Sequence, residues 1–294
     1  MSIYQAIKEL SEQKQYPISR LCRYLNISRG AFYRWLKHPI SSSEQQNLDI
    51  AEKIKNIHAA HPDMGYRRIR DELAKHYHLD VNDKRILRIC RKENIQSTIK
   101  WKPKSCTRSS RDPAHLAKNY LNRNFYALTP NEKWLTDVTE FKYYVGVEIH
   151  KIYLSAILDL YDRRIVAYKI GDRNDNTLVN STFDEAVRLE PKAHPLFHSD
   201  RGFQYTSLAF CTKLKKHAMK QSMSRVAHCT DNGPMEGFWG ILKREAYYGR
   251  RFKSKTTLIE TIERYIAYYN TERIQRGLRL MTPMEFNTHY YLVA

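Results

Sequence analysis

Three carboxylates in the second half of the chain have the type and placement needed for chemistry on a phosphodiester. Asp137 lies in the run WLTDVTEF, Asp200 in FHSDRGFQYTS and Glu236 in DNGPMEGFWGILKRE, with 62 residues between the first two and 35 between the last two. Mg²⁺ prefers oxygen ligands, and two Mg²⁺ ions about 3.5–4 Å apart stabilise charge on the entering and leaving oxygens of a phosphodiester. Three carboxylates gathered from separate elements would therefore form a catalytic, metal-binding site for strand cleavage or transfer.

The segments around these carboxylates predict the elements that position them. Alternating apolar and polar residues, rich in β-formers, indicate three antiparallel strands within 131–171. Helical spacing then predicts helices at 177–189, 207–217, 235–247 and 256–269, with short strands at 196–199 and near 220–224. This order is typical of an RNase-H-like mixed sheet, so we expect an α+β catalytic core over 131–290. Asp137 would then lie in the first strand, Asp200 after a short strand and Glu236 at the start of a helix.

The first third of the chain shows helical patterns. Residues 1–40 predict a helix-turn-helix DNA-binding domain, whose last helix follows the N-cap Ser28 and points Arg29, Tyr33 and Arg34 outward. The segment SSSEQQ is predicted to be a linker, and residues 48–95 a second helical DNA-binding module. In that module the residues expected to contact DNA are Arg67, Arg68, Lys84, Arg85 and Arg88. The alternatives are an ordinary helical hairpin in 1–40 and a solvated charged face in 48–95.

The charge balance favours a polyanionic partner. Lys and Arg total 50 against 31 Asp and Glu, a net charge of +19. Residues 1–110 carry 22 basic and 11 acidic residues, so the N-terminal third is the more cationic part. Within 96–130 seven basic residues accompany the single acid Asp112, which predicts a basic linker that follows a phosphate backbone. Double-stranded DNA is the expected partner, and a merely basic soluble enzyme is the alternative.

Several other protein classes are excluded by the sequence. The five cysteines are scattered and form no CxxC pair, which argues against a disulfide framework and a Cys-rich zinc site. The N-terminus is charged and amphipathic, unlike a signal peptide. The sequence has no run of about 18 apolar residues, the length that spans a membrane. These features predict a cytoplasmic protein with no membrane partner.

Five stretches of the chain resemble one known family. They are WLTDVTEF, HSDRGFQYTS, SMSRVAHCTDNGPMEGFWGILKRE, YYNTERIQRGLRLMTPMEF and HPDMGYRRIRDELAKHYHLDVNDKRILRICRKENI. They are similar to OrfB-type DDE transposases of bacterial insertion sequences, a two-frame family related to retroviral integrases. The resemblance covers nearly the whole chain. It implies a protein that binds the ends of its element and catalyses DNA strand cleavage and strand transfer.

The resemblance also implies roles for individual residues. Asp137, Asp200 and Glu236 match the catalytic triad, which holds two Mg²⁺ ions, or Mn²⁺ in their place. Lys243 lies seven residues after Glu236, on the same face of a continuous helix, and matches the basic residue that contacts the element end. Gln275 stands where relatives often have His, a departure that leaves the triad complete.

Partners and alternatives follow from the same resemblance. It implies binding to terminal repeats and target DNA, a homo-oligomer in a synaptic complex, and a fusion with, or a role beside, the product of an upstream reading frame. It also implies a bacterial protein associated with the nucleoid. Two other functions stay open. One is a DNA-binding regulator or second-frame half-enzyme that modulates a fused transposase, and the other is an RNase-H-like nuclease acting on RNA–DNA hybrids.

Overall fold

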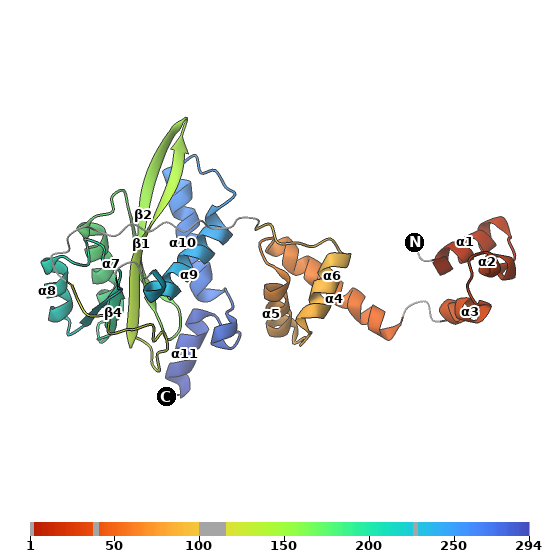
Figure 1. Ribbon diagram of the computed structural model, residues 1–294, viewed down its shortest axis with the longest axis horizontal. Coiled ribbons are helices and arrows are strands. Elements are labelled where there is room, and N and C mark those ends of the chain that lie inside the picture. The colour runs from red at the N-terminus through yellow and green to blue at the C-terminus, as the bar shows by residue number, and fades with distance from the viewer. Residues whose placement is uncertain (1–2, 38–40, 100–115, 226–228, 294) are drawn as a thin grey trace. The chain divides into compact units, whose positions relative to one another are not determined.

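The protein divides into two compact units, Met1–Ser97 and Thr98–Ala294 (Figure 1). The structure is a computed structural model that describes residues 3–37, 41–99, 116–225 and 229–293. The first unit is helical, and the second combines a five-stranded sheet with helices. Much of the basic linker expected at 96–130, namely residues 100–115, lies outside the described residues.

The first three helices form a small bundle. They are α1 (Ile3–Lys14), α2 (Ile18–Tyr24) and α3 (Arg29–Lys37). Each contributes one buried side chain to a shared apolar centre made of Ile7, Cys22 and Phe32. Ser28 begins α3 because its Oγ accepts a hydrogen bond from Ala31 N at 3.1 Å and so satisfies a free N–H group of the first turn.

The next three helices share a second apolar core. They are α4 (Ser42–Ala60), α5 (Tyr66–Tyr77) and α6 (Asp83–Lys92), with Ile54, Leu73 and Ile86 fully buried between them. The segment SSSEQQ is helical and not a linker, so that expectation is wrong. The segment is helical because Ser41 caps the start of α4: its Oγ accepts a hydrogen bond from Glu44 N at 3.1 Å. A Ser followed three residues later by Glu is a strong helix-start signal.

The second unit is built on a mixed sheet in the order β3-β2-β1-β4-β5. Its strands are β1 (Lys133–Val145), β2 (Glu148–Asp159), β3 (Ile165–Gly171), β4 (Leu196–Ser199) and β5 (Lys220–Met223). β2 pairs antiparallel with both β1 and β3, whereas β4 pairs parallel with both β1 and β5. The RNase-H-like mixed sheet predicted from the sequence is confirmed.

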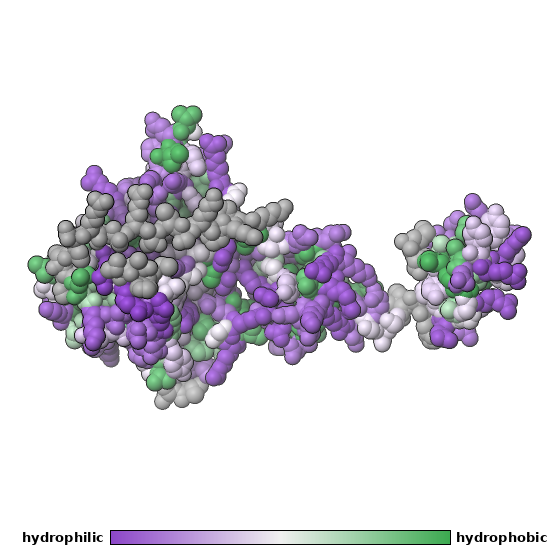
Figure 2. Space-filling model, viewed as in Figure 1, coloured by the Kyte–Doolittle hydropathy of each residue, from purple (hydrophilic) through white to green (hydrophobic). Residues whose placement is uncertain are grey.

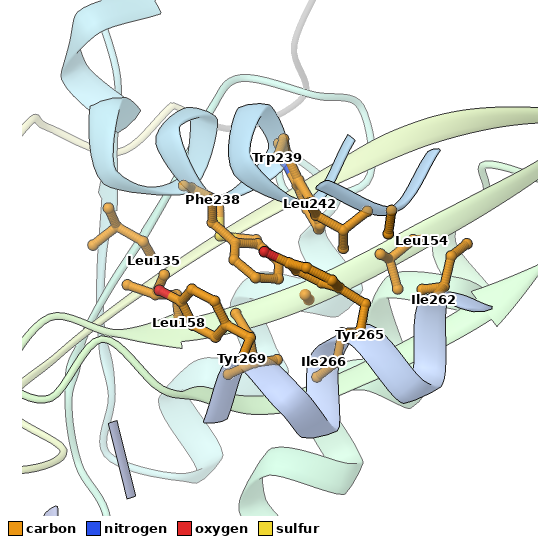
Figure 3. Close-up of a cluster of buried hydrophobic side chains, with 14 of the residues drawn as sticks. Leu135, Leu154, Leu158, Phe238, Trp239, Leu242, Ile262, Tyr265, Ile266 and Tyr269 are labelled. Carbon is orange, nitrogen blue, oxygen red and sulfur yellow. The ribbon is translucent and has the colours of Figure 1, made fainter. Parts of the chain in front are cut away.

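Helices cover both faces of this sheet. They are α7 (Asn176–Leu189), α8 (Leu208–Lys216), α9 (Gly233–Leu242), α10 (Lys255–Thr271) and α11 (Pro283–Val293), with short 3-10 or π turns at Cys229–Asn232, Lys243–Tyr247 and Arg276–Leu278. Successive residues of a strand point to opposite faces, so Trp134 packs with α7 and α8, and Leu135 with α9 and α10. Figure 3 shows the second of these cores, where side chains of α9 and α10 meet over the sheet.

Residues 116–132 contain neither helix nor strand, yet they pack on the sheet unit. Leu121 and Ala127 are buried in its core. Ser222 Oγ on β5 accepts hydrogen bonds from Tyr120 N at 3.0 Å and Leu121 N at 3.1 Å. The later part of the segment expected as a linker is therefore fixed to the sheet unit, because its apolar side chains are buried there.

Candidate active site

Asp137 lies in β1, where two donors fix its carboxylate. Oδ1 accepts a hydrogen bond from Val138 N at 2.8 Å, and Oδ2 accepts one from Trp239 Nε1 on α9 at 3.0 Å. The residue is half-buried. Loss of hydration, followed by the negative charge of Asp200, raises the pKa of Asp137 to about 7. A cation placed here would therefore favour the ionised carboxylate.

The parallel pairing of β1 with β4 brings Asp200 to Asp137. The pairing ends at Leu135 and His198, two residues before Asp137 and Asp200, and the two carboxylates are close enough for the charge of Asp200 to act on Asp137. Gly202 N donates to Asp200 Oδ1 at 2.9 Å. A Cβ at Gly202 would lie 3.0 Å from that oxygen and 2.9 Å from Gln204 Oε1, so a larger residue here would push on the Asp200 carboxylate. Burial raises the pKa of Asp200 as well.

Glu236 lies in the first turn of α9, and the residue that precedes this helix is attached to β1. Asn232 Nδ2 donates to Thr136 O at 3.1 Å, one residue before Asp137. The charge of Glu236 also raises the pKa of Asp137, although the Glu236 side chain is exposed. The structure thus brings Asp137 and Asp200 together and places Glu236 within electrostatic range of Asp137. Among the described residues, no three His, Cys, Asp or Glu side chains form a group ready to hold a metal ion.

The donor chemistry of this site fits a divalent cation. Carboxylate oxygens are the ligands that Mg²⁺ prefers. Asp137 and Asp200 hold like charges close together in a half-buried place, and a bound cation would offset that repulsion. In addition, the amide oxygen Oδ1 of Asn232 is buried and makes no hydrogen bond within the described structure. The site therefore has acceptor oxygens to spare.

Asp231 is a residue of this region that the sequence did not reveal. It is fully buried, and its carboxylate accepts hydrogen bonds from Arg225 Nε and Nη2, each at 2.9 Å, and from Arg123 Nε at 2.7 Å. The hydrogen bond from Arg225 is the main reason that the pKa of Asp231 is well below its usual range. The sequence signal that could identify Asp231 is the Asp-Asn pair just before the helix of Glu236.

Trp239 is a second residue of the site that the sequence analysis did not identify. It lies three residues after Glu236 and is therefore near it on the helix surface.

Lys243 begins a π-helical turn that follows α9 directly. Lys243 keeps helical backbone angles, with φ of −64° and ψ of −37°, so the helix expected over 235–247 continues and only its last turn is wound as a π-helix. Lys243 Nζ lies 5.1 Å from the centre of the Phe141 ring. Burial lowers the pKa of Lys243, while Glu140 and Asp137 act in the opposite direction. Lys243 is thus within electrostatic range of Asp137.

The residues predicted to contact DNA in the first unit fall into two groups. The exposed ones are Arg29, Tyr33 and Arg34 on α3, Arg67 on α5, and Lys84 and Arg88 on α6. The other two are half-buried and engaged within the protein. Arg68 Nη1 pairs with Asp63 Oδ2 at 3.0 Å, and Arg85 Nε donates to Asn47 Oδ1 at 2.9 Å. Arg68 and Arg85 therefore hold helices and loops in place.

Matches to integrase family models assign the sheet unit to the class of integrase-type polynucleotidyl transferases. The family model described as Integrase core domain matches residues 127–229, a second model of that description matches 236–290, and the model HTH-like domain matches 44–103. InsK of Escherichia coli (strain K12), named as a transposase for insertion sequence element IS150, is 36% identical over 289 residues, which cover 97% of this chain and 99% of InsK. The chain therefore belongs to the IS3 family of insertion-sequence transposases.

Other relatives agree with this assignment. A transposase-like protein of Haemophilus influenzae is 38% identical over 210 residues, 71% of this chain and 94% of its own. The transposase InsF for insertion sequence IS3A of Escherichia coli is 29% identical over 286 residues, 93% and 95% of the two chains. Among solved structures, the HTLV-2 integrase catalytic core domain in complex with magnesium matches 54% of this chain and 98% of its own length, with 19% identity and a TM-score of 0.42.

In the described part of the chain, no helix has both the length and the apolar character needed to cross a membrane.

Proposed function

We propose that the chain binds the ends of its insertion element and catalyses Mg²⁺-dependent DNA strand cleavage and strand transfer. Asp137, Asp200 and Glu236 would be the catalytic residues and would hold two Mg²⁺ ions, or Mn²⁺ in their place. The observation that supports this proposal is that the parallel pairing of β1 and β4 ends at Leu135 and His198, two residues before Asp137 and Asp200. Glu236 lies in the first turn of the nearby helix α9. A transposase-family chain with this arrangement has the ligand chemistry that metal-assisted phosphoryl transfer requires.

The chain's own residues hold the carboxylates for this role. When bound, the divalent ions would stabilise negative charge on the attacking and departing oxygens of the phosphodiester. Val138 N and Trp239 Nε1 each fix one oxygen of Asp137, and Gly202 N fixes one oxygen of Asp200. Each carboxylate oxygen has lone pairs beyond those used by these donors, so the hydrogen bonds orient the ligands and leave acceptor sites for a cation.

The proposed reaction has two steps, and each is an attack on a phosphodiester phosphorus. Water first attacks the phosphorus at the element end, and the P–O3′ bond breaks to leave a 3′-hydroxyl on the element. That hydroxyl then attacks a phosphodiester of the target and expels the target's 3′-oxygen. Lys243, half-buried over Phe141 and within range of Asp137, is proposed to contact a phosphate of the element end.

DNA recognition is proposed for the helical unit. Residues 1–40 and 48–95 would act as two DNA-binding modules, 96–130 as a basic connection and 131–290 as the catalytic core. Arg29, Tyr33 and Arg34 are exposed on α3, which supports the proposal that α3 is a recognition helix. Two element ends must be held at once, so a homo-oligomer in a synaptic complex is part of the proposal, as is a fusion with the upstream-frame product.

A cleavage and strand-joining assay tests this function. The substrate is a labelled duplex that carries the ends of the element encoding the chain, in Mg²⁺, and the proteins are wild type and Glu236→Gln. Glu260→Gln is the matched control, because Glu260 is an exposed glutamate on α10. We expect cleaved and joined products from wild type and from Glu260→Gln, and none from Glu236→Gln.

The other outcomes separate the alternatives. Equal products from wild type and Glu236→Gln would contradict the proposed site. Binding without products from any of them would favour a regulator or half-enzyme, and the upstream-frame fusion would then be assayed in the same way. Cleavage of an RNA–DNA hybrid in preference to the element-end duplex would favour an RNase-H-like nuclease.

A further inference from the structure

Beyond the acidic site, β1 and β2 continue as a two-stranded ribbon. β4 pairs with β1 at Lys133–Leu135, and β3 pairs with β2 between Tyr153 and Leu158. Residues 141–152, all of them described, therefore pair only with each other. This hairpin ribbon projects from the sheet (Figure 1). Because an isolated two-stranded hairpin is marginally stable in water, the ribbon needs support from neighbouring chain or from a partner.

The β1 strand of the hairpin ribbon is supported by the π-helical turn after α9 and by the loop that precedes α10. Tyr144 N donates to Phe252 O at 2.8 Å. Tyr247 accepts a hydrogen bond from Lys142 N at 2.9 Å and donates one to Lys142 O at 3.0 Å. Its ring meets the ring of Phe141 edge to face, with 5.0 Å between ring centres. These contacts fix the first half of the ribbon and stop at Tyr144.

The tip of the hairpin ribbon carries three exposed aliphatic side chains and one exposed acid, Glu148. Gly146, with φ of +61°, and Val147 form a two-residue turn of the kind that matches strand twist. Val145 is 53% exposed, Val147 95% and Ile149 58%. Figure 2 shows this end as green residues standing out among purple neighbours. Aliphatic side chains gathered at a projecting end are unfavourable in water, so they indicate a surface that a partner covers.

The charge beside the hairpin ribbon identifies that partner. The stretch 243–255 carries six Lys and Arg residues and one acid, Glu245. Arg250 and Lys253 are exposed in the supporting loop, and the guanidinium of Arg251 lies 4.7 Å from the centre of the Tyr144 ring on the ribbon. A cationic loop next to exposed aliphatic side chains is complementary to a duplex, which offers phosphates outside and base surfaces within its grooves.

We propose that the hairpin ribbon is a DNA-binding wedge, in which Val147 and Ile149 enter a groove of the duplex while Arg250 and Lys253 contact its phosphates. The inference rests on the proposed function, because that function places DNA at Asp137. From Asp137 to Val145 the strand extends about 26 Å, so the tip reaches at most about eight base pairs along a duplex from that site. Apolar side chains pressed between base steps bend DNA, so the wedge would deform the duplex beside the reacting phosphate.

Photocrosslinking tests what covers the tip. The full chain with Glu236→Gln, used so that the DNA stays intact, carries p-benzoylphenylalanine in place of Val147. The matched control carries it in place of Leu208, a 68% exposed leucine at the start of α8. The probe is a labelled duplex with the element ends. We expect crosslinks to DNA from position 147, within about eight base pairs of the scissile phosphate, and none from position 208. Crosslinks to a second copy of the chain, or none to DNA, would overturn the proposal.

Binding measurements separate the two parts of the wedge. Val147→Ser combined with Ile149→Ser should weaken duplex binding about tenfold and leave its salt dependence unchanged, because no charge is removed. Arg250→Ala combined with Lys253→Ala should reduce the slope of log affinity against log salt by about two. Unchanged affinity in the first variant, or an unchanged slope in the second, would contradict the wedge.

Controls keep this proposal separate from the proposed function. Lys215→Ala combined with Lys216→Ala, which removes two exposed lysines from α8, should leave the salt slope as it is. Circular dichroism and thermal unfolding check that each variant is folded. Because crosslinking uses uncleaved DNA, the wedge can be confirmed even if wild type shows no cleavage. Cleavage by wild type with no crosslink from position 147 would remove the wedge and leave the proposed function in place.

Discussion

Trp239 Nε1 donates a hydrogen bond to Asp137 Oδ2 at 3.0 Å, so an indole joins the helix of Glu236 to the strand of Asp137. Trp239 is buried in the core between α9 and α10, as Figure 3 shows. Hydrogen bonds to a charged acceptor are about twice as strong as neutral ones. This contact therefore fixes the orientation of the Asp137 carboxylate and ties its position to that of Glu236.

Trp239→Phe tests this contact, because it keeps a ring in the core and removes the donor. A hydrogen bond to a charged group contributes about 1.5–3 kcal/mol. We therefore expect about tenfold slower cleavage of element-end duplex and a higher half-saturating Mg²⁺ concentration, both measured by cleavage rates across a Mg²⁺ titration. Trp134→Phe is the control, since Trp134 Nε1 donates to Asn131 Oδ1 at 3.1 Å instead. Equal Mg²⁺ responses of the two variants would show that the Asp137 contact has no special role.

Asp231→Asn should destabilise the sheet unit through the loss of a buried charge. Asp231 joins Arg123 of the segment before β1 to Arg225, near α9. Losing charge-assisted hydrogen bonds should lower the free energy of unfolding by about 2–3 kcal/mol, measured by urea denaturation. Since the pKa of Asp231 is lowered in the folded state, its contribution is present above the ordinary pKa of aspartate and is lost as the pH falls below it.

A surface ion pair supplies the control for Asp231. Asp184 Oδ2 lies 2.7 Å from Lys213 Nζ, and the Asp184 side chain is 58% exposed. Asp184→Asn should cost less than about 1 kcal/mol, because exposed ion pairs are weak. If Asp231→Asn were as stable as Asp184→Asn, the buried carboxylate would have no part in holding this region together.

The architecture of the sheet unit is largely predictable from local sequence. Strand alternation and helical spacing are properties of short segments, and the helix expected at 177–189 differs from α7 by one residue at its start. The failures at helix starts are also local. Ser41 accepts a hydrogen bond from Glu44 N before α4, and Thr282 and Glu285 form a reciprocal cap before α11. The Ser-rich composition around Ser41 favours a linker, and no helix is predicted after Thr282.

Side-chain partners distant in sequence are the part that local patterns do not reveal. Arg123 meets Asp231 across 108 positions, and Arg85 meets Asn47 across 38. Arg123 and Arg85 both lie in basic segments, which suggest contact with phosphate. In the folded protein each of them donates to an acceptor within the chain instead. The catalytic roles of Asp137, Asp200 and Glu236 stay predictions, although the sheet register explains why two of them approach each other.

Arg88 and Arg85 on α6 form a matched pair that separates DNA contact from helix packing. Arg88 is exposed, whereas Arg85 donates to Asn47 Oδ1 at 2.9 Å and to Gln46 Oε1 at 3.4 Å on α4. Arg88→Ala should weaken duplex binding and lower the salt slope by about one, with stability unchanged. Arg85→Ala should instead lower the free energy of unfolding by about 1 kcal/mol. Filter binding across a salt series and urea denaturation measure these effects, and the reverse pattern would contradict the assignment.

Asp159 gives the sheet unit a pH dependence opposite in sign to that of Asp231. It is fully buried at the end of β2. Burial, and then the charge of Asp162, raises the pKa of Asp159 to about 7, against the opposing charge of Arg164. The folded carboxyl thus keeps its proton up to about pH 7, whereas the unfolded one loses it near pH 4. The folded state holds more protons in this window, so the free energy of unfolding should fall as the pH rises through it.

Asp159→Asn isolates this effect from that of other titrating groups. The neutral amide cannot lose a proton, so the decrease in the free energy of unfolding between about pH 5 and pH 8 should be smaller than in wild type by at least about 1 kcal/mol. Urea denaturation at the two pH values measures it. The comparison uses slopes, because the amide replaces an oxygen that accepts from Tyr161 N or Asn131 N and lowers stability at every pH. Asp184→Asn, at the exposed pair with Lys213, should keep the wild-type slope, and an equal slope in Asp159→Asn would show that Asp159 stays ionised in the folded protein.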